Sequence, residues 1–323
     1  MFEPILLDKV WGGRRLERLG KKLPPGAKIG ESWELADLDS TSASGAGGGA
    51  ARSVIASGLL AGKTLHDAMT LWKRDLMGSL DADRPFPLLI KFLDASENLS
   101  VQVHPSPAYA ASHPEAHLKT ECWYILDAAP GSVIYKGIKP GVTPELFAKH
   151  IKDGTVVNDL VAVPAVVGEC HNLPSGTCHA LGAGVLVAEV QTPSDTTFRV
   201  FDWGRTGREL HIDQALECID FGPAPGAAKL PKGKVSGQLV GTEFFRVDEV
   251  FLPAGGRVPL AESNDGPRVL IVLSGSASVR AGSAGDEPVH AGVGTTLLIP
   301  ANRVASGQVI AKAGTRLLVV TIR

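Results

Sequence analysis

Residues 86–105 read FPLLIKFLDASENLSVQVHP, and this stretch decides the expected fold. Two apolar runs flank the turn-forming segment 94–98 (DASEN), which predicts two short strands joined by a turn. In the second run, Gln102 and His104 are two positions apart, so on a strand both side chains project from the same face. We therefore expect a β-sheet that presents two metal-capable groups to one cavity.

Short strand-like runs continue on both sides of this stretch. Strands are expected at 121–127, at 132–136 and repeatedly between 165 and 201, whereas apolar spacing and capping residues predict amphipathic helices at 64–80 and 143–153. The 37 glycines, 22 prolines and 6% aromatic residues favour many strands joined by turns over a helical bundle. The expected fold class is all-β with inserted helices, as a barrel or a sandwich.

The chain is long enough for two hydrophobic cores. The tract 223–234, rich in Pro, Gly, Ala and Lys, predicts a linker between a first domain at 1–222 and a second small barrel at 235–323. Strand-like runs with glycine-rich turns fill the second part. The small polar tract Ser40–Ala51 (STSASGAGGGAA) predicts an exposed loop that takes no part in chemistry.

Charge and hydropathy limit the classes of molecule that the protein is expected to bind. The formal net charge is -2, which gives no electrostatic footprint for nucleic acid, and no basic run suggests a membrane surface. The start of the chain has no signal-peptide pattern, so we expect a cytoplasmic protein. Because the charge indicates neither nucleic acid nor membrane, we expect a small-molecule partner and no obligate protein partner. The four cysteines lack a CxxC spacing and are expected to be reduced, buried thiols.

Two further segments carry metal-capable groups. Glu121 opens a predicted strand after Lys119, and residues 173–179 (LPSGTCH) form a turn that delivers His179 onto another strand. With Gln102 and His104 they supply two imidazoles, a carboxylate and an amide oxygen, a set that suits Zn²⁺ or a related divalent ion. Fewer than six protein ligands leave room for water or substrate, as catalysis requires. Taken singly, each residue could instead be a packed histidine or a solvated glutamate.

Three of these blocks resemble the signature motifs of the class I (type I) phosphomannose isomerases, a branch of the cupins: QVHP at 102–105, KTE at 119–121 and LPSGTCHALG at 173–182. Other similar blocks are VWGGR at 10–14, IGESWE at 29–34, PLLIK at 87–91, and LVAEVQ at 186–191 followed by Arg199. The resemblance is specific over about residues 1–220 and only architectural beyond, and the chain length is similar to the short bacterial form.

The resemblance implies two cupin-type jelly-roll β-barrels and interconversion of mannose 6-phosphate and fructose 6-phosphate, so a sugar phosphate is the expected partner. It implies one divalent metal, with Zn²⁺ as first choice. Its ligands would be Gln102, His104, Glu121 and His179. The substrate pocket would be lined by Lys91, Ser100, Lys119, Glu189 and Arg199. The turn at 299–304 (IPANRV) has no histidine, so the second barrel is expected to lack a metal site.

Residue chemistry suggests roles for the pocket groups. Aldose–ketose isomerisation moves a proton between C2 and C1 through an enediol, and Glu189 is the candidate base because burial can raise a carboxylate pKa. Lys119 would carry a second proton or neutralise charge. Arg199 and Lys91 would grip the phosphate, with a hydrogen bond from Ser100.

Three other interpretations remain open from sequence. Glu189 and Arg199 could form an ordinary cross-strand ion pair on the barrel surface. The chain could be a cupin isomerase or epimerase of an unphosphorylated sugar. It could also be a non-catalytic cupin that binds a sugar phosphate.

Overall fold

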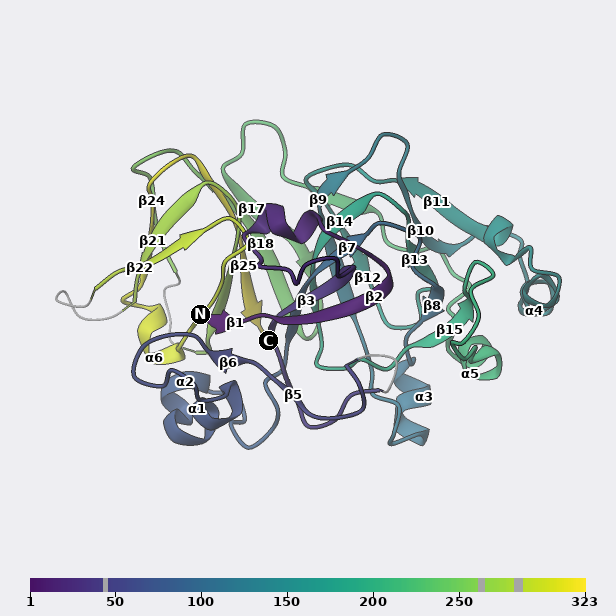
Figure 1. Cartoon of the computed structure of the whole chain (residues 1–323), viewed down its shortest axis with the longest axis horizontal. Coiled ribbons are helices and arrows are strands. Elements are labelled where there is room, and N and C mark those ends of the chain that lie inside the picture. Colours follow the sequence, from purple (N-terminus) through teal and green to yellow (C-terminus); the bar gives the residue numbers. More distant parts are fainter. Residues whose placement is uncertain (43–45, 261–264, 282–286) are drawn as a thin grey trace.

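The computed structural model describes residues 1–42, 46–260, 265–281 and 287–323, and its regular structure is mostly antiparallel β-sheet (Figure 1). The N-terminal half contains a seven-stranded sheet. In spatial order its strands are β16 (Ala227–Lys229), β12 (Glu169–Leu173), β9 (Glu121–Ala128), β14 (Val185–Gln191), β7 (Leu89–Ala95), β3 (Ile29–Leu35) and β2 (Ile5–Gly13). A five-stranded sheet accompanies it, in the order β11 (Leu160–Pro164), β10 (Val133–Ile138), β13 (His179–Leu181), β8 (Val101–Val103) and β15 (Phe198–Phe201).

The C-terminal half repeats this two-sheet arrangement with fewer strands. One sheet has the order β17 (Ser236–Gly241), β18 (Phe245–Leu252), β25 (Thr315–Ile322), β20 (Arg268–Ser274) and β23 (Thr296–Ile299). The other has the order β19 (Arg257–Pro259), β24 (Gln308–Ala311), β21 (Ser276–Arg280) and β22 (Val289–Gly292). Two short ribbons pair β1 (Phe2–Glu3) with β6 (Val54–Ile55), and β4 (Asp37–Leu38) with β5 (Ala51–Arg52).

The seven-stranded sheet is the central layer of the molecule. On one face, Phe92 and Tyr124 share a hydrophobic cluster with Phe245 and Leu318 of the C-terminal half. The opposite face packs against the N-terminal five-stranded sheet. Every residue of β7 and β14 is buried because both faces are covered, which explains why their sequences are nearly continuous apolar runs. A polar residue on the inner face of these strands is therefore cut off from bulk water.

Helices occupy the loops between strands. They are α1 (Leu65–Trp72), α2 (Arg74–Met77), α3 (Pro107–Ser112), α4 (Pro144–Lys152), α5 (Ile212–Cys218) and α6 (Ala301–Val304), with 3₁₀ turns η1 (Arg15–Leu19) and η2 (Val156–Asp159). The helix predicted at 143–153 is confirmed by α4, with Thr143 as its N-cap and Pro144 at its start. Figure 1 shows α2 beside α6, so the first half contacts the second there too.

The helix predicted at 64–80 is confirmed in part: it begins after the Thr64 cap, but Lys73 divides it into α1 and α2, and α2 ends at Met77. Lys73 has φ of 40°, a conformation unfavourable for a non-glycine residue and incompatible with a continuous helix. The predicted apolar stripe also divides there: Leu71 and Trp72 are 60% and 39% exposed, whereas Leu76 is buried. Beyond the break, α2 buries Leu76 and Met77.

Predictions from the sequence also cover the cysteines, a linker and an exposed loop. The four cysteines are free and buried, as predicted. The predicted linker 223–234 contains β16, which pairs with β12 of the central sheet. Of the predicted loop Ser40–Ala51, residues 43–45 lie outside the described residues.

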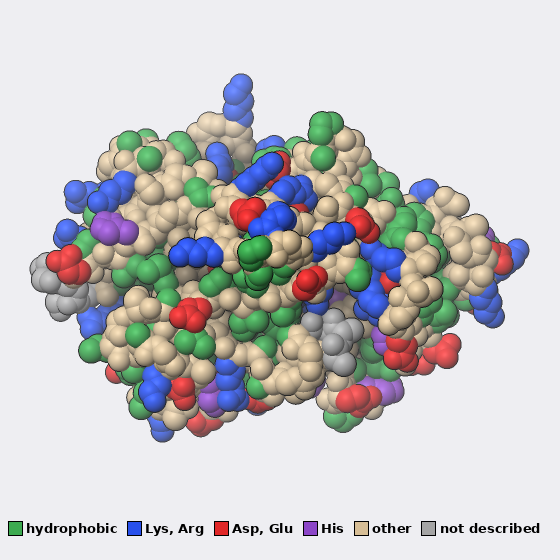
Figure 2. Space-filling view, viewed as in Figure 1, with side chains coloured by type: hydrophobic (Ala, Val, Ile, Leu, Met, Phe, Trp, Pro, Cys, Tyr) green, Lys and Arg blue, Asp and Glu red, His purple; other side chains and the backbone are tan. Residues whose placement is uncertain are grey.

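The surface and the helices bear on possible partners. On the face drawn in Figure 2, Lys and Arg side chains are interspersed with Asp and Glu and do not gather into one basic field. Among the described residues, no helix has the length and hydropathy needed to cross a membrane.

Candidate active site

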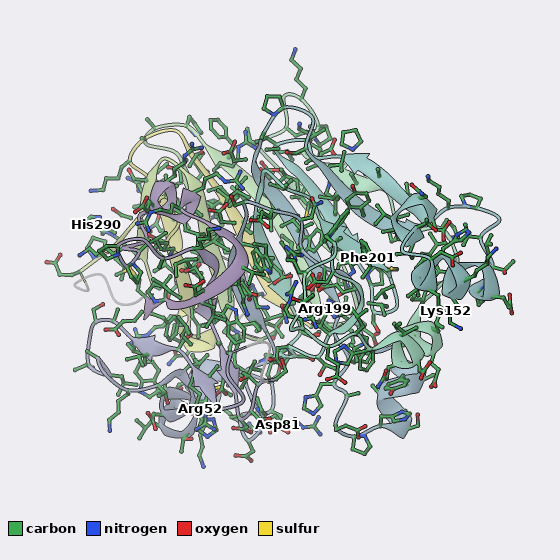
Figure 3. All side chains as sticks on the ribbon, turned by 45° about the vertical axis from the view of Figure 1, so that its right-hand side comes forward. Arg52, Asp81, Lys152, Arg199, Phe201 and His290 are labelled. Carbon is green, nitrogen blue, oxygen red and sulfur yellow. The ribbon has the colours of Figure 1, made fainter. Side chains whose placement is uncertain are left out.

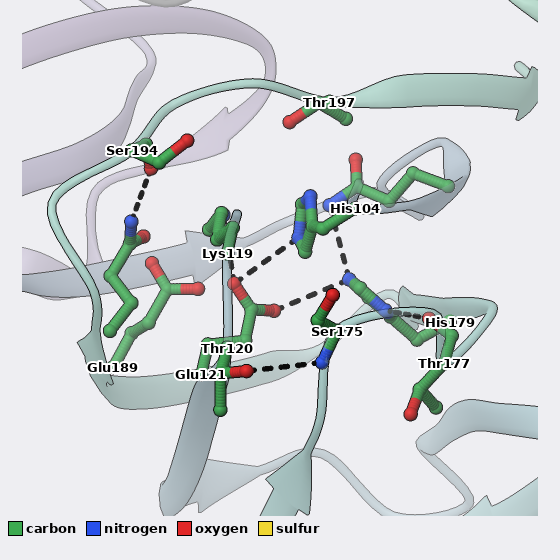
Figure 4. A network of polar contacts seen from close by, with 12 residues as sticks. His104, Lys119, Thr120, Glu121, Ser175, Thr177, His179, Glu189, Ser194 and Thr197 are labelled. Carbon is green, nitrogen blue, oxygen red and sulfur yellow. Dashed lines mark hydrogen bonds and ion pairs between the residues drawn. The ribbon is translucent and has the colours of Figure 1, made fainter. Parts of the chain in front are cut away.

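Three buried metal-capable side chains meet between the two N-terminal sheets (Figure 4). His104 follows β8, Glu121 begins β9 and His179 begins β13. The Nε2 atoms of His104 and His179 lie 3.3 and 3.2 Å from the two carboxylate oxygens of Glu121. All candidate ligand atoms lie within 4.8 Å of one another. Residues far apart in sequence thus converge on one point, as a metal centre requires.

Hydrogen bonds orient both imidazole rings toward this point. Nδ1 of His104 lies 2.9 Å from the Thr196 carbonyl oxygen, and Nδ1 of His179 lies 2.8 Å from the Thr177 carbonyl oxygen. A carbonyl only accepts hydrogen bonds, so each Nδ1 carries the proton and each Nε2 directs a lone pair at Glu121. Burial, reinforced by the charge of Lys119, lowers the pKa of His104 to about 3, so the ring is neutral.

The donor set fits a divalent cation. Within the part of the chain that the structure describes, Nε2 of His104 and both carboxylate oxygens of Glu121 are buried and have no hydrogen-bond partner, although Oε2 of Glu121 forms an ion pair with Lys119. Such atoms are costly unless something else satisfies them. Burial alone would raise the pKa of Glu121, but the ammonium of Lys119, 2.8 Å away, and the imidazole of His104 hold it well below its ordinary value. The cluster therefore offers two neutral nitrogens and an ionised carboxylate.

Gln102 borders the cluster, as its spacing from His104 suggested. It pairs with His179 in the β8–β13 register, and its side-chain amide lies 3.3 Å from Nε2 of His179. Rotating the amide by half a turn presents its oxygen at the same point. Ser100 donates a hydrogen bond to this amide oxygen in the present orientation, at 3.3 Å.

A polar cavity adjoins the cluster. Six residues singled out from sequence line it: Lys91, Ser100, Gln102, Lys119, Glu189 and Arg199. Further lining residues include Glu31, Trp33, Ser42, Trp123 and Arg208. The structure thus brings all the predicted pocket residues to one cavity beside His104, Glu121 and His179.

Glu189 is buried on β14 and faces this cavity. Its Oε1 accepts a hydrogen bond from the Trp123 indole at 3.0 Å, its Oε2 lies 3.4 Å from Nζ of Lys91, and that oxygen has no hydrogen-bond partner. Burial, and next the negative charge of Glu121, raise the pKa of Glu189. Among the residues described, Oε2 of Glu189 has only its ion pair with Lys91, and a fixed carboxylate with a raised pKa is suited to accept a proton.

Arg199 reaches the cavity from β15 and lies near the centre of the molecule in Figure 3. Its guanidinium donates to the Glu209 carbonyl oxygen at 2.7 Å, while its Nε is buried without a partner. Burial and then the nearby charge of Arg208 lower the pKa of Arg199. Arg208 is ion-paired with Asp202, so Arg199 is the guanidinium group that remains to bind an anion at this cavity. Glu189 is 2% exposed and forms its ion pair with Lys91. The alternative interpretation, an ion pair between Glu189 and Arg199 on the protein surface, therefore does not apply.

Sequence reasoning missed several lining residues. Ser42, in the tract assigned no role in chemistry, lines the cavity and donates hydrogen bonds to Asp195 from its backbone and hydroxyl. Glu31 accepts a hydrogen bond from the Trp33 indole at 2.7 Å. Because side chains alternate between the two faces of a strand, the IGESWE block could have predicted that Glu31 and Trp33 share one face. Arg208 lies in a loop and left no local signal.

The fold and site together define a β-sheet protein with a candidate metal centre beside a cationic cavity. Residues 4–131 match the family model of the type I phosphomannose isomerase catalytic domain. Mannose-6-phosphate isomerase ManA of Bacillus subtilis is 38% identical over 232 residues, which cover 69% of each chain. The Streptococcus mutans mannose-6-phosphate isomerase is 35% identical over 260 residues, 76% of this chain and 78% of that one.

Structural comparison extends the similarity to the whole chain. The crystal structure of the mannose 6-phosphate isomerase from Bacillus subtilis superposes with a TM-score of 0.84 at 29% identity, covering 99% of this chain and 98% of the other. The chain belongs to the type I phosphomannose isomerase family, which confirms the resemblance inferred from the sequence motifs.

Proposed function

We propose that this protein is a metal-dependent aldose–ketose isomerase that interconverts mannose 6-phosphate and fructose 6-phosphate. The observation that carries the proposal is the buried His104–Glu121–His179 cluster beside a cavity that holds both a buried carboxylate, Glu189, and converging cationic side chains. The substrate is assigned by the names of the family relatives and by the cationic cavity, which suits a phosphorylated sugar.

Gln102, His104, Glu121 and His179 would hold one divalent metal, for which we propose Zn²⁺. When bound, such an ion acts as a Lewis acid that polarises the oxygens of the sugar. The protein supports it by fixing both imidazole tautomers through the Thr177 and Thr196 carbonyl groups.

Glu189 is the proposed general base. It would remove the proton from C2 of the aldose and return it to C1 through an enediol, and Trp123 holds the carboxylate in place for both transfers. The Lys119 ammonium, ion-paired with Glu121, would move protons to and from the sugar oxygens. Burial of these groups excludes water that would compete for the proton.

Arg199 would bind the phosphate through its planar guanidinium, with Lys91 supplying charge and Ser100 a hydroxyl hydrogen bond. The unpartnered Nε of Arg199 leaves a donor available for a phosphate oxygen. This arrangement favours a phosphorylated sugar over a free sugar, which has no dianion to place beside Arg199 and Lys91.

We also propose that the two halves are cupin-type jelly rolls. The support is the pairing of two antiparallel sheets in each half and the overall similarity to the Bacillus subtilis isomerase structure. In this proposal residues 1–222 form the catalytic domain, 223–234 the linker, and 235–323 a degenerate barrel that has lost its metal ligands.

The deciding experiment measures conversion of mannose 6-phosphate to fructose 6-phosphate by purified protein before chelation, after chelation and after addition of Zn²⁺. Free mannose is assayed in parallel. Metal-dependent turnover of the phosphorylated sugar alone is the expected result. Turnover of mannose at a comparable rate would indicate an isomerase of unphosphorylated sugars, and no turnover at full metal occupancy would indicate a binding protein.

A further inference from the structure

A second cavity opens on the opposite face of the central sheet. It has a volume of about 360 Å³ and shares no lining residue with the candidate active site. Trp123 lines the active-site cavity and Tyr124 lines this one, because successive side chains on β9 point to opposite faces. Its other wall comes from β18, β20 and β25 of the C-terminal half. The volume lies within the roughly 300–1,000 Å³ typical of small-molecule pockets.

A buried carboxylate with one free oxygen lines this cavity. Glu249 is 0% exposed. Its Oε1 accepts a hydrogen bond from the Tyr124 hydroxyl at 3.1 Å and forms an ion pair with Arg316, whereas its Oε2 has no hydrogen-bond partner in the described part of the chain. Burial, and then the charge of Glu249, raise the pKa of Tyr124 above its ordinary value, so the phenol keeps its proton and donates. A buried carboxylate oxygen that accepts no hydrogen bond is unfavourable, so a ligand that donates a hydrogen bond to it would be stabilised in this cavity.

The rest of the lining is cationic and aliphatic. The ammonium of Lys229 donates one hydrogen bond to the Val167 carbonyl oxygen at 2.9 Å, and an ammonium has three protons to donate. With Glu249, Lys229 and Arg316 as its charged residues, the lining carries one negative and two positive groups. Aliphatic walls are contributed by Leu126, Leu230 and Leu273.

We propose that this cavity binds a small carboxylate monoanion that bears a hydroxyl group and an aliphatic body. The hydroxyl donates to Oε2 of Glu249, the carboxylate reaches Lys229, and the aliphatic part packs against the leucines. The single negative charge of such a ligand balances the excess positive charge of the lining. Because both halves of the molecule contribute residues, an occupied site ties the halves together. This site is independent of the proposed isomerase activity.

Calorimetric titration of the metal-loaded full-length protein tests the proposal with two matched probes. The first is 2-hydroxyisocaproate, which has the hydroxyl, the carboxylate and the branched chain. The second is 4-methylpentanoate, which lacks only the hydroxyl. Binding of the first probe and at least about tenfold weaker binding of the second are expected, because only the first donates to a buried carboxylate. Equal binding of both probes would overturn the role of Glu249.

A pair of neighbouring variants locates the binding. Val167 lines the cavity and is 51% exposed, whereas Val166 is 38% exposed and does not line it. Val167→Trp fills the mouth and should abolish binding of 2-hydroxyisocaproate, while Val166→Trp should leave it unchanged. Because both residues are partly exposed, neither change disturbs a buried core. Binding that survives Val167→Trp would place the ligand elsewhere and refute the site.

Two further measurements complete the test. Glu249→Gln should weaken binding of 2-hydroxyisocaproate about tenfold through loss of the charged acceptor. Arg199→Ala should leave this binding unchanged, which separates the site from the candidate active site. Absence of binding to the unmodified protein up to about 10 mM probe would refute the proposal, with water alone then satisfying Glu249.

Discussion

The two halves of the molecule are built alike from paired antiparallel sheets, yet their interiors differ in chemistry. Between the N-terminal sheets lie His104, Glu121 and His179, buried and partly without hydrogen-bond partners. Between the C-terminal sheets lies a hydrophobic cluster that includes Leu270 and Leu317. The segment 299–304, which the sequence predicted to correspond to the turn before His179, contains α6 and carries no histidine.

This difference shows that the sheet arrangement alone does not specify a metal or catalytic site. The same sheet arrangement can enclose an apolar core, which stabilises the protein, or a polar cluster, which is costly to bury and is retained for a function. His290 illustrates the contrast: Figure 3 shows it at the outer edge of the second half, and it contacts only the Ser278 hydroxyl among the hydrogen bonds described. Four changes would break or sharpen this comparison.

The largest effect is expected from removing an imidazole of the cluster. His104→Ala or His179→Ala should abolish metal binding and lower kcat by roughly a thousandfold or more, because the activity depends on the metal. Metal content by elemental analysis and turnover of mannose 6-phosphate are measured on the same sample. His290→Ala in the second half is the matched control and should change neither. An active variant without metal would falsify the assignment of the cluster.

The next effect concerns the proposed base. Glu189→Gln should retain the metal but lose roughly 10²–10⁴-fold in kcat, the usual contribution of a general base. The exposed Glu145→Gln on α4 is the control and should behave like the unmodified protein. Rates close to those of the unmodified protein for Glu189→Gln would assign proton transfer to another group.

A smaller and more selective effect is expected at the cationic side of the cavity. Arg199→Ala should raise KM for mannose 6-phosphate by roughly a hundredfold, since a charge-assisted double hydrogen bond is lost. Activity toward free mannose, however low, should change much less. The comparison of KM values for the two sugars checks this, and an equal loss for both would argue against a phosphate contact.

The smallest effect on chemistry is expected in the apolar interior of the second half. Leu270→Ala should lower the free energy of unfolding by about 2–5 kcal/mol, as large-to-small core substitutions do. Denaturant unfolding measures this loss, while metal content and kcat per folded molecule should remain unchanged. A drop in metal occupancy would mean that the second half controls the cluster in the first.

Much of the candidate site was predictable because local spacing carries the information. The two-residue separation of Gln102 and His104 and the turn before His179 specify which side chains share a face. The helix at 143–153 was predicted for a similar reason, because Thr143 and Pro144 act on the adjacent backbone. In each case the physical cause lies within a few residues of its effect.

Other features depend on contacts between distant segments. The indole of Trp123 reaches Glu189 and Ser42 reaches Asp195, and neither pair is close in sequence. The break at Lys73 likewise has no signal in the apolar spacing of 64–80. No periodic pattern in the sequence predicts these features.

The amino-acid sequence by itself determined the β-rich class, the family and the identities of the metal-capable residues, because strand periodicity and short motifs are local properties. Only the tertiary structure decided which atoms lie buried without partners, which cationic groups converge on one cavity, and that a second cavity forms around Glu249 between the halves. Burial and charge proximity are properties of the space between segments, and they exist only once distant strands have packed against one another.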